Sequence, residues 1–423
     1  MTTIRDPLWN NISVDDVALR LIDTATFQRL RYVRQLGLAY LVYPGATHTR
    51  FEHAVGAYHL ARRTLRLLEE GGELARIAPD ETAIIKAAAL LHDIGHYPFS
   101  HALEEIGALN HEEVAHKLIF RGPVADVLTD AVGHDAPTRI HALIRGQSAS
   151  PLQGLISGSL DLDKIEYLKR DALMCGVPYG EIDVDRLLHS LTIVDDPATG
   201  RLSVGILEKG LAALESLLFA KYQMYRNVYW HHAVRSATAM YKRIVDDALR
   251  ASVLVETELA SLNDEGLVHR LETAEPCAPL LTALRGRRLH KRAADLASVE
   301  LPPESEWIAM NPSLVYAVET AVAREIGIAP GDILLDFPAK PQMLGLDIPV
   351  VRRDGRVERL TTEGIAGAVS LPTLSAELYS SARRLRVFVR AGEEIPLEAI
   401  LGLVRCDADE VAGRLRNGRA LVS

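Results

Sequence analysis

A histidine followed directly by an aspartate, His92-Asp93, stands at the end of a strongly apolar run, AAALL, at residues 87–91. Both side chains are good ligands for a divalent metal ion. Burying both of them against alanine and leucine would be costly unless something pairs with them, and a metal ion would pair with both at once. This part of the chain is therefore expected to fold around a metal site.

The helical geometry of this segment restricts where the metal can lie. Adjacent residues of a helix point about 100° apart, because one turn takes 3.6 residues. His92 and Asp93 can share an ion only near a helix end or bend, and Gly95 and Pro98 provide that bend. Spacing does not identify the remaining ligands. The best candidates are His53 in RFEHAVG and Asp163 in SLDLDKIEYLKRD, although either could be an ordinary helix-face residue.

Histidines are concentrated near this pair. Six of the 15 histidines lie at positions 53, 92, 96, 101, 111 and 116. Taken singly, His96, His101 and His111 could be helix caps or satisfied polar residues. Their density together with carboxylates is the usual composition of a metal-dependent hydrolytic site.

Hydrophobic periodicity predicts a mainly helical fold. Helices are expected at 14–40, 49–68, 80–95, 101–107, 111–120, 123–132, 137–145 and, as an amphipathic segment, 157–170. The stretch SLTIVDDPATGRLSVGIL, residues 190–207, predicts a hairpin through its Asp-Pro and Thr-Gly turns. No Gly or Pro occurs between Gly210 and Gly266, which predicts one very long helix or two joined without a strong breaker.

The pattern of apolar and turn residues changes after about Pro330. Short apolar runs such as DILLDF and RLRVFVR alternate there with turn residues. We expect a core at 1–250, a helical extension at 251–329 and a small C-terminal α+β unit at 330–423.

Composition excludes several classes of protein. The net charge of −9 argues against a nucleic-acid binder, which should be basic. No apolar run approaches the ~20 residues of a membrane span. Cys175, Cys277 and Cys406 form no CxxC pair, which argues for a reducing compartment and against a thiolate metal site. The start MTTIRDPLWNNI lacks the pattern of a signal peptide, so a cytoplasmic protein is expected.

Four motifs together resemble the HD-domain phosphohydrolases. They are HTRFEH (48–53), LLHDIGHYPFSH (90–101), HEE (111–113) and DLDKIEYLKRD (161–171). The segments IDTATFQRLRYVRQLG (22–37) and YPGATHTRFEHAVG (43–56) are similar to the deoxynucleoside triphosphate (dNTP) triphosphohydrolase branch. The resemblance covers residues 1–250 well and 280–295 patchily. It implies a helical HD core that binds one divalent metal ion (Mg, Mn, Fe, Zn, Ni or Co) through His53, His92, Asp93 and Asp163.

The reaction implied by this resemblance is attack of water on the α-phosphorus of a dNTP, which releases deoxynucleoside and intact triphosphate. The matching catalytic residues are His111, His101, Glu104, His96 and Glu112. One of the histidines at 101 and 111 is expected to act as general acid. The matching substrate residues are Arg50 and Lys164 for the triphosphate, Tyr167 near the sugar, Gln35 and Asp171 for the 3′-hydroxyl, and Leu36 crowding the 2′ position.

A second set of residues resembles the family's allosteric nucleotide pocket between subunits. These are Asp23, Gln28, Arg31, Asp183, Arg186, Arg287 and Lys291. They imply a homo-oligomer, often a tetramer, that responds to an effector such as GTP or a dNTP. The chain departs from the family pattern where Asn10-Asn11 replaces the usual His-Gly. It also departs near Val228 and Ser236, where Arg226, Tyr229, His232 or Arg235 could substitute for a phosphate-binding arginine and a base-side tyrosine.

Two other functions remain open on the sequence alone. One is another HD-type nucleotide phosphohydrolase or phosphodiesterase, and the other is a non-catalytic nucleotide sensor. The joint presence of Gln35, Leu36, Lys164, Tyr167 and Asp171 favours dNTP hydrolysis.

Overall fold

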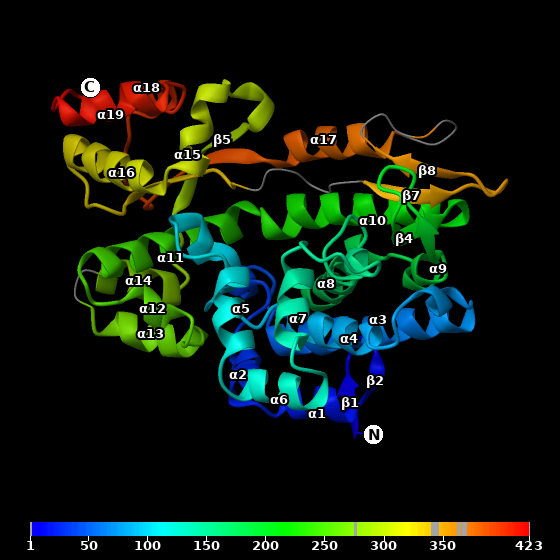
Figure 1. Ribbon diagram of the computed structural model, residues 1–423. Coiled ribbons are helices and arrows are strands. Elements are labelled where there is room, and N and C mark those ends of the chain that lie inside the picture. The colour runs from blue at the N-terminus through cyan, green and yellow to red at the C-terminus, as the bar shows by residue number, and fades with distance from the viewer. Residues whose placement is uncertain (1, 275–276, 340–346, 362–364, 366–369, 423) are drawn as a thin grey trace.

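A computed structural model describes residues 2–274, 277–339, 347–361, 365 and 370–422 of the chain. Helices α10 (Leu211–Met224) and α11 (His232–Arg250) run through the middle of the molecule in Figure 1. The helices of the N-terminal half lie below them, and the C-terminal strands and helices lie above. The expected mainly helical fold with small sheets is confirmed. Within the described residues, no helix is long and apolar enough to cross a membrane.

The N-terminal half begins with a hairpin and continues as helices. Its elements are β1 (Thr2–Asp6), β2 (Asn10–Val14), α1 (Asp16–Ile22), α2 (Ala25–Gln28), α3 (Arg50–Glu70), α4 (Glu81–Leu91), α5 (His111–Phe120), α6 (Pro123–Ala131), α7 (Ala136–Ile144), α8 (Leu162–Cys175) and α9 (Val184–Leu188). Short 3₁₀ helices span Arg29–Tyr32, Gly37–Leu41, Glu73–Arg76, Ser100–Ile106 (η4), Gln153–Leu155, Pro178–Gly180 and Glu208–Gly210.

The single helix expected at 14–40 is wrong. Thr24 caps a new helix by accepting a hydrogen bond from the N–H of Phe27, and such local side-chain bonds compete with helix continuation. Val33 is extended, and the N–H of Gln35 donates to the carbonyl of His48 at 3.0 Å. Gly37 then adopts φ +53°, with the carbonyl oxygen of Phe99 where a Cβ would lie. This irregular segment, residues 33–37, brings Gln35 and Leu36 to the main cavity.

The helix expected at 49–68 is confirmed as α3. Thr49 and Glu52 form a capping box at its start, which satisfies N–H groups that the first turn leaves free. The helix expected at 80–95 ends earlier, at Leu91, and residues 92–95 form turns. The segment expected as helix at 101–107 is the 3₁₀ helix η4. The next three predicted helices, at 111–120, 123–132 and 137–145, are confirmed as α5, α6 and α7.

The amphipathic segment expected to begin at residue 157 becomes helical only at α8, where Asp161 caps the first turn. The hairpin at 190–207 is confirmed as antiparallel strands β3 (Leu191–Asp195) and β4 (Leu202–Leu207). After Gly210 the chain forms two helices joined by a π-turn over Tyr225–Tyr229. Helices α12 (Glu256–Leu259), α13 (Asp264–Glu272) and α14 (Ala278–Arg285) follow.

Strand pairing in the C-terminal part crosses residue 330. Strand β7 (Ile348–Val351) pairs in parallel with β4 and antiparallel with β8 (Val357–Leu360). Strand β9 (Arg384–Val389) pairs with both β5 (Lys291–Ala297) and β6 (Ile333–Asp336). The expected division at 250 and 330 stays a prediction. The other elements are 3₁₀ helices Ser298–Glu300 and Pro303–Glu306, with α15 (Trp307–Met310), α16 (Pro312–Ile326), α17 (Leu371–Ala382), α18 (Leu397–Leu403) and α19 (Ala408–Arg416).

A buried ionic network fastens β6 and η4 to α11. Arg235 of α11 lies 2.5 Å from Asp336 of β6 and 2.8 Å from Glu105 of η4. Lys242, two turns further along α11, lies 2.8 Å from Glu105 and 3.3 Å from Asp336. Although burial opposes ionisation, Arg235 and Lys242 hold the pKa of Glu105 well below its usual range. The 3₁₀ helix η4, which carries His101 and Glu104, is thus held against α11.

Candidate metal centre and nucleotide cavity

One cavity of about 740 Å³ gathers side chains from most of the sequence motifs. Segments around residue 35, the start of α3, the turns after α4, η4, α5, α8 and α11 all contribute to its wall. Pockets of this size bind small organic ligands. The cavity is where the predicted metal, catalytic and substrate residues meet.

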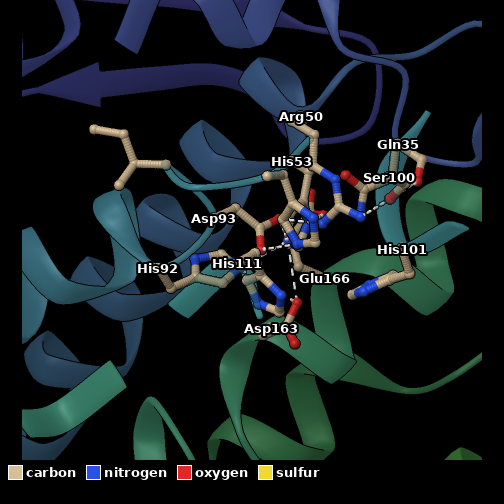
Figure 2. A network of polar contacts seen from close by, with 12 residues as sticks. Gln35, Arg50, His53, His92, Asp93, Ser100, His101, His111, Asp163 and Glu166 are labelled. Carbon is tan, nitrogen blue, oxygen red and sulfur yellow. Dashed lines mark hydrogen bonds and ion pairs between the residues drawn. The ribbon is translucent and has the colours of Figure 1, made fainter. Parts of the chain in front are cut away.

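Four predicted metal ligands converge on this cavity. Nε2 of His53 lies 3.1 Å from Nε2 of His92, 3.0 Å from Oδ1 of Asp163 and 3.4 Å from Oδ2 of Asp93. Nε2 of His92 lies 3.5 Å from Oδ1 of both Asp93 and Asp163. Figure 2 shows the four side chains pointing toward one another.

The helix end explains how His92 and Asp93 can face the same point. Helix α4 ends at Leu91, and the N–H groups of Ile94 and His96 close turns onto the carbonyls of Leu91 and Asp93. Nδ1 of His92 is 2.9 Å from the carbonyl of Ala89, which fixes the proton on that nitrogen and leaves Nε2 as a lone-pair donor.

The donor set fits a divalent metal ion. Two imidazole nitrogens and two carboxylates are a mixed nitrogen and oxygen set, which many divalent metals accept. The ligand atoms of His53, His92 and Asp93 all lie within 4.8 Å of one another. Two Nε2 atoms at 3.1 Å repel each other if both carry lone pairs, and a cation between them removes that repulsion. These residues could hold a divalent metal ion, and we call the four of them the metal-binding cluster.

The charges around the cluster are strongly coupled. Burial alone would lower the pKa of His53, but the carboxylates of Asp163, Glu166 and Asp93 raise it to about 10. Burial opposes ionisation of Asp93, yet Arg50, His92 and His96 hold the pKa of that carboxyl well below its usual range. The carboxylates are therefore ionised and ready to accept a cation.

Glu166, which sequence reasoning missed, lies behind the cluster. Its Oε2 is 2.7 Å from Nδ1 of His53, on the far side of the ring from the other ligands. In the sequence it stands three residues after Asp163, on the same face of α8, and that spacing was the available signal.

Arg50 lies at the edge of the cluster. Its Nη1 is 2.5 Å from Oδ2 of Asp93, and its Nη2 donates to the hydroxyl of Ser100. That hydroxyl in turn donates to the carbonyl of Gln35 at 3.1 Å. The predicted phosphate contact is thus a buried cation that also ties the turn after α4 to the segment around residue 35.

A second cluster, of histidines, lines the cavity beside the first. Glu104 accepts from Nδ1 of His111 at 2.7 Å and lies 3.5 Å from Nδ1 of His101. The ring of His96 stacks on that of His111 with centroids 3.9 Å apart. Burial, with Arg50 and His111 nearby, holds the pKa of His96 well below its usual range. Although burial opposes ionisation of Glu104, His101 and His111 hold its pKa well below the usual range.

Glu112, also predicted as catalytic, takes a different partner. It lines the cavity, but its carboxylate lies 3.7 Å from Nε of Arg145 and contacts no histidine of the cluster. Its catalytic role stays a prediction.

The predicted substrate residues Gln35, Leu36, Lys164, Tyr167 and Asp171 all line the cavity. Gln35 is 7% exposed, and its side-chain carbonyl has no hydrogen-bond partner. Lys164 pairs with Asp161 and donates to the carbonyl of Gly158 at 2.9 Å.

Asp171 already has two partners, which the sequence did not reveal. Its Oδ1 lies 2.7 Å from Nε2 of His48, and its Oδ2 accepts from the hydroxyl of Tyr229 at 2.7 Å. Of the four residues proposed as substitutes in the long helix, Tyr229 and Arg235 line the cavity.

The predicted allosteric residues lie on three separate parts of one chain. Asp23 follows the last residue of α1, Gln28 ends α2, and Arg31 lies in the 3₁₀ helix after α2. The side chain of Gln28 accepts a hydrogen bond from Nε of Arg31 at 2.7 Å. Figure 1 places α2, α9 and β5 apart from one another.

The other four allosteric candidates, Asp183, Arg186, Arg287 and Lys291, are exposed to solvent. Asp183 caps α9 by accepting from the N–H of Arg186. Nε of Arg287 donates to the carbonyl of Leu41 at 2.6 Å, and Lys291 begins β5. A single chain therefore does not bring the seven residues together.

Comparisons with known proteins match the same segments. A family model described as HD domain matches residues 50–134, and one described as HD associated region matches residues 182–365. The uncharacterized protein MJ1154 of Methanocaldococcus jannaschii is 35% identical, and the match covers 85% of this chain and 74% of that protein. A crystal structure of a hypothetical protein from Aquifex aeolicus superposes with a TM-score of 0.71 at 28% identity, covering 92% of this chain and 96% of that one.

A further relative carries a functional name. The deoxynucleoside triphosphate triphosphohydrolase SAMHD1 homolog of Dictyostelium discoideum is 29% identical, and the match covers 68% of this chain and 59% of that protein. The HD match contains His53, His92 and Asp93, and the MJ1154 match spans most of both proteins. The chain therefore belongs to the HD-domain family of metal-dependent phosphohydrolases, as a member with an HD-associated region.

Proposed function

We propose that the chain hydrolyses dNTPs to deoxynucleoside and intact triphosphate, with one divalent metal ion held by His53, His92, Asp93 and Asp163. One observation carries this proposal. A single cavity of about 740 Å³ is lined by His92, Asp93 and Asp163 of the metal-binding cluster, by the histidine cluster and by the predicted sugar-side residues. The name of the Dictyostelium relative supports the same reaction.

The phosphate end of the substrate would lie at the metal-binding cluster. A divalent ion bound there supplies Lewis-acid chemistry at a phosphate oxygen. Arg50 and Lys164 add positive charge, and each now pairs with a carboxylate, Asp93 and Asp161 respectively. A triphosphate carries several negative charges, so it would compete for both cations.

The leaving 5′-oxygen needs a proton, and His111 is the best-placed donor. Glu104 accepts from its Nδ1, so Nε2 is the nitrogen left to face a substrate. A protonated His111 would donate from Nε2 to the leaving oxygen, while Glu104 stabilises the imidazolium charge. His101, on the other side of Glu104, is the alternative proton donor.

The sugar end would lie near Gln35, Leu36 and Asp171. The buried side-chain carbonyl of Gln35 has no partner, which supports a ligand hydroxyl there. Asp171 is held by His48 and Tyr229, and each of its oxygens has a lone pair left for a 3′-hydroxyl. The side chain of Leu36 would crowd a 2′-hydroxyl and so favour deoxyribose.

We also propose that a nucleotide effector, GTP or a dNTP, binds between copies of the chain in a homo-oligomer, with a tetramer expected. The seven allosteric candidates lie on separate parts of one chain, so only association could join them. An effector bound across an interface stabilises the oligomer. Light scattering with and without GTP tests this directly, and an unchanged mass would contradict it.

The reaction itself is tested by incubating the protein with each dNTP and Mn²⁺ or Mg²⁺, with and without GTP or a second dNTP. Chromatography separates the products. Deoxynucleoside plus triphosphate, absent with the Asp163→Ala variant, is the expected result. Monophosphate plus pyrophosphate, or turnover of a phosphodiester alone, would place the chain in another branch of HD phosphohydrolases. No turnover with any nucleotide would favour a sensor.

A further inference from the structure

A chain of buried charged residues runs from the metal-binding cluster to the N-terminal hairpin. His53 is 0% exposed and uses both ring nitrogens, Nε2 toward the other ligands and Nδ1 toward Glu166. A ring nitrogen bound to a carboxylate carries the proton, which leaves the opposite nitrogen free to bind metal. Figure 2 shows Glu166 in the same network of polar contacts as His53.

Arg170 holds Glu166 in place. It is also 0% exposed, and its Nε and Nη2 lie 2.8 and 2.7 Å from Oε1 of Glu166. Its Nη1 donates to Oδ2 of Asp6 at 3.0 Å. Because Arg170 sits between two carboxylates, moving either of them alters the position of the other.

The outer end of this chain of contacts is the hairpin turn at residues 6–10. Oδ1 of Asp6 accepts from the backbone N–H groups of Leu8 and Trp9 at 2.9 and 2.7 Å. The indole N–H of Trp9 donates directly to Oε1 of Glu166 at 3.0 Å. The turn therefore contacts Glu166 twice, once through Trp9 and once through Asp6 and Arg170.

The packing of α3 against α8 is shaped around this network. A Cβ on Gly56, one turn after His53, would lie 2.0 Å from Oε1 of Glu166 and 2.8 Å from Nη2 of Arg170. Only glycine leaves room for the buried pair at that point. The close approach of the two helices at Gly56 thus leaves room for the ionic network.

We propose that Glu166 is a positioning residue for the metal centre, and that Arg170 and the hairpin turn, through Asp6 and Trp9, hold it in register with His53. The network orients the imidazole and keeps its proton on Nδ1, so that Nε2 is presented to the metal ion. The state of the hairpin then affects metal affinity. This inference rests on the metal-binding cluster and not on the identity of the substrate.

The test is calorimetric titration of the metal-stripped full chain with Mn²⁺, without nucleotide. Loss of such a supporting carboxylate weakens metal binding about 10- to 100-fold, and we expect that rise in Kd for Glu166→Gln. The matched control is Glu319→Gln, which makes the same substitution at another buried glutamate, paired with Arg243 and outside the cavity. A thermal melt of each variant reports its fold.

The outcomes separate positioning from general stability. A raised Kd in Glu166→Gln with an unchanged Kd in Glu319→Gln supports the proposal. A wild-type Kd in folded Glu166→Gln, or equal weakening in both variants, overturns it. If Glu166→Gln does not fold, Trp9→Phe decides, since it removes the indole N–H and keeps an aromatic ring at residue 9: weaker Mn²⁺ binding supports the network, and unchanged binding overturns it. Absence of dNTP hydrolysis would leave each of these results standing.

Discussion

Oε1 of Glu104 lies 2.7 Å from Nδ1 of His111, and the pair lines the same cavity as the metal-binding cluster. An ionised carboxylate can only accept hydrogen bonds, so it fixes the proton of His111 on Nδ1 and directs Nε2 elsewhere. Burial opposes its ionisation, but the two neighbouring histidines hold the pKa of Glu104 well below its usual range. We therefore propose that the carboxylate orients His111 as the acid and is not itself the acid.

We expect Glu104→Gln to lower kcat about 10²-fold with little change in KM, since general acid catalysis contributes about 10²- to 10⁴-fold. The glutamine amide has a single oxygen, which can accept a hydrogen bond from one histidine. Its N–H groups then face the other histidine and favour the wrong tautomer of that ring. Steady-state kinetics with the best dNTP measures the effect. Glu113→Gln is the control, because Glu113 lies in the first turn of α5, the helix of His111, and its side chain is 49% exposed. Equal kcat in both variants would contradict the role of Glu104.

Asp163→Ala should remove both bound metal and turnover. Its Oδ1 lies 3.0 Å from Nε2 of His53 and 3.5 Å from that of His92, so the variant loses one of four converging donors. Metal content after dialysis is measured by elemental analysis. Asp185→Ala, which removes an exposed carboxylate paired with Arg63 on the surface, should keep metal and activity. Full metal content in Asp163→Ala would show that the ligand set is wrong.

Neighbours in the sequence were the easiest part of this site to predict. His92 and Asp93 are adjacent, and their apolar setting was enough to indicate a metal. Glu166 was not predictable in the same way, because its partner His53 lies 113 positions away. In the sequence it reads as one charge among many on an amphipathic helix. Its buried position depends on Gly56, where a Cβ would lie 2.0 Å from Oε1 of Glu166.

Helix boundaries show the same limit. Periodicity predicted α3 and α5 well, and in the structure those helices are long or capped by side chains. The segment at 14–40 has helical periodicity too, but it breaks where the hydrogen bonds of Thr24 and the crossing near Gln35 take over. Those bonds depend on partners such as His48, which no local pattern contains. Pairing of β4 with β7 is likewise a long-range contact.

The stability of the C-terminal part should depend on pH through Glu319. This residue is 6% exposed and accepts from the N–H of Leu335 at 2.7 Å. Burial raises its pKa to about 7, although Arg243 and that N–H act in the opposite direction. In the unfolded chain the same group titrates near ~4.3. Between these values the folded protein holds a proton that the unfolded chain has lost.

The contribution of Glu319 to the free energy of unfolding is therefore fully present below pH ~4.3 and falls as pH rises to about 7. The loss is on the order of 4 kcal/mol, because each unit of pKa shift corresponds to about 1.4 kcal/mol. Glu319→Gln does not titrate, so wild type should lose stability relative to the variant between pH 5 and pH 8. Urea unfolding of both proteins at the two pH values measures this, and the groups they share cancel. A constant difference would contradict the shifted pKa.

Gly95→Ala should displace α5 from the metal centre. A Cβ at position 95 would lie 2.1 Å from the carbonyl oxygen of His111 and 2.6 Å from the N of Ala115, both backbone atoms that cannot rotate away. Overpacking of this kind costs about 1–3 kcal/mol. Because the displaced turn carries His111, kcat should fall while His53, His92 and Asp93 still bind Mn²⁺.

The control for this variant is Gly402→Ala in α18, where a Cβ meets nothing within 4 Å. Alanine favours helix over glycine by about 1 kcal/mol, so this change should leave stability equal or higher and activity unchanged. Urea unfolding, Mn²⁺ titration and steady-state kinetics on both variants separate the three effects. Wild-type stability and kcat in Gly95→Ala would contradict this prediction. The close contact between the turn after Asp93 and the start of α5 would then not be needed to hold the histidine cluster beside the metal.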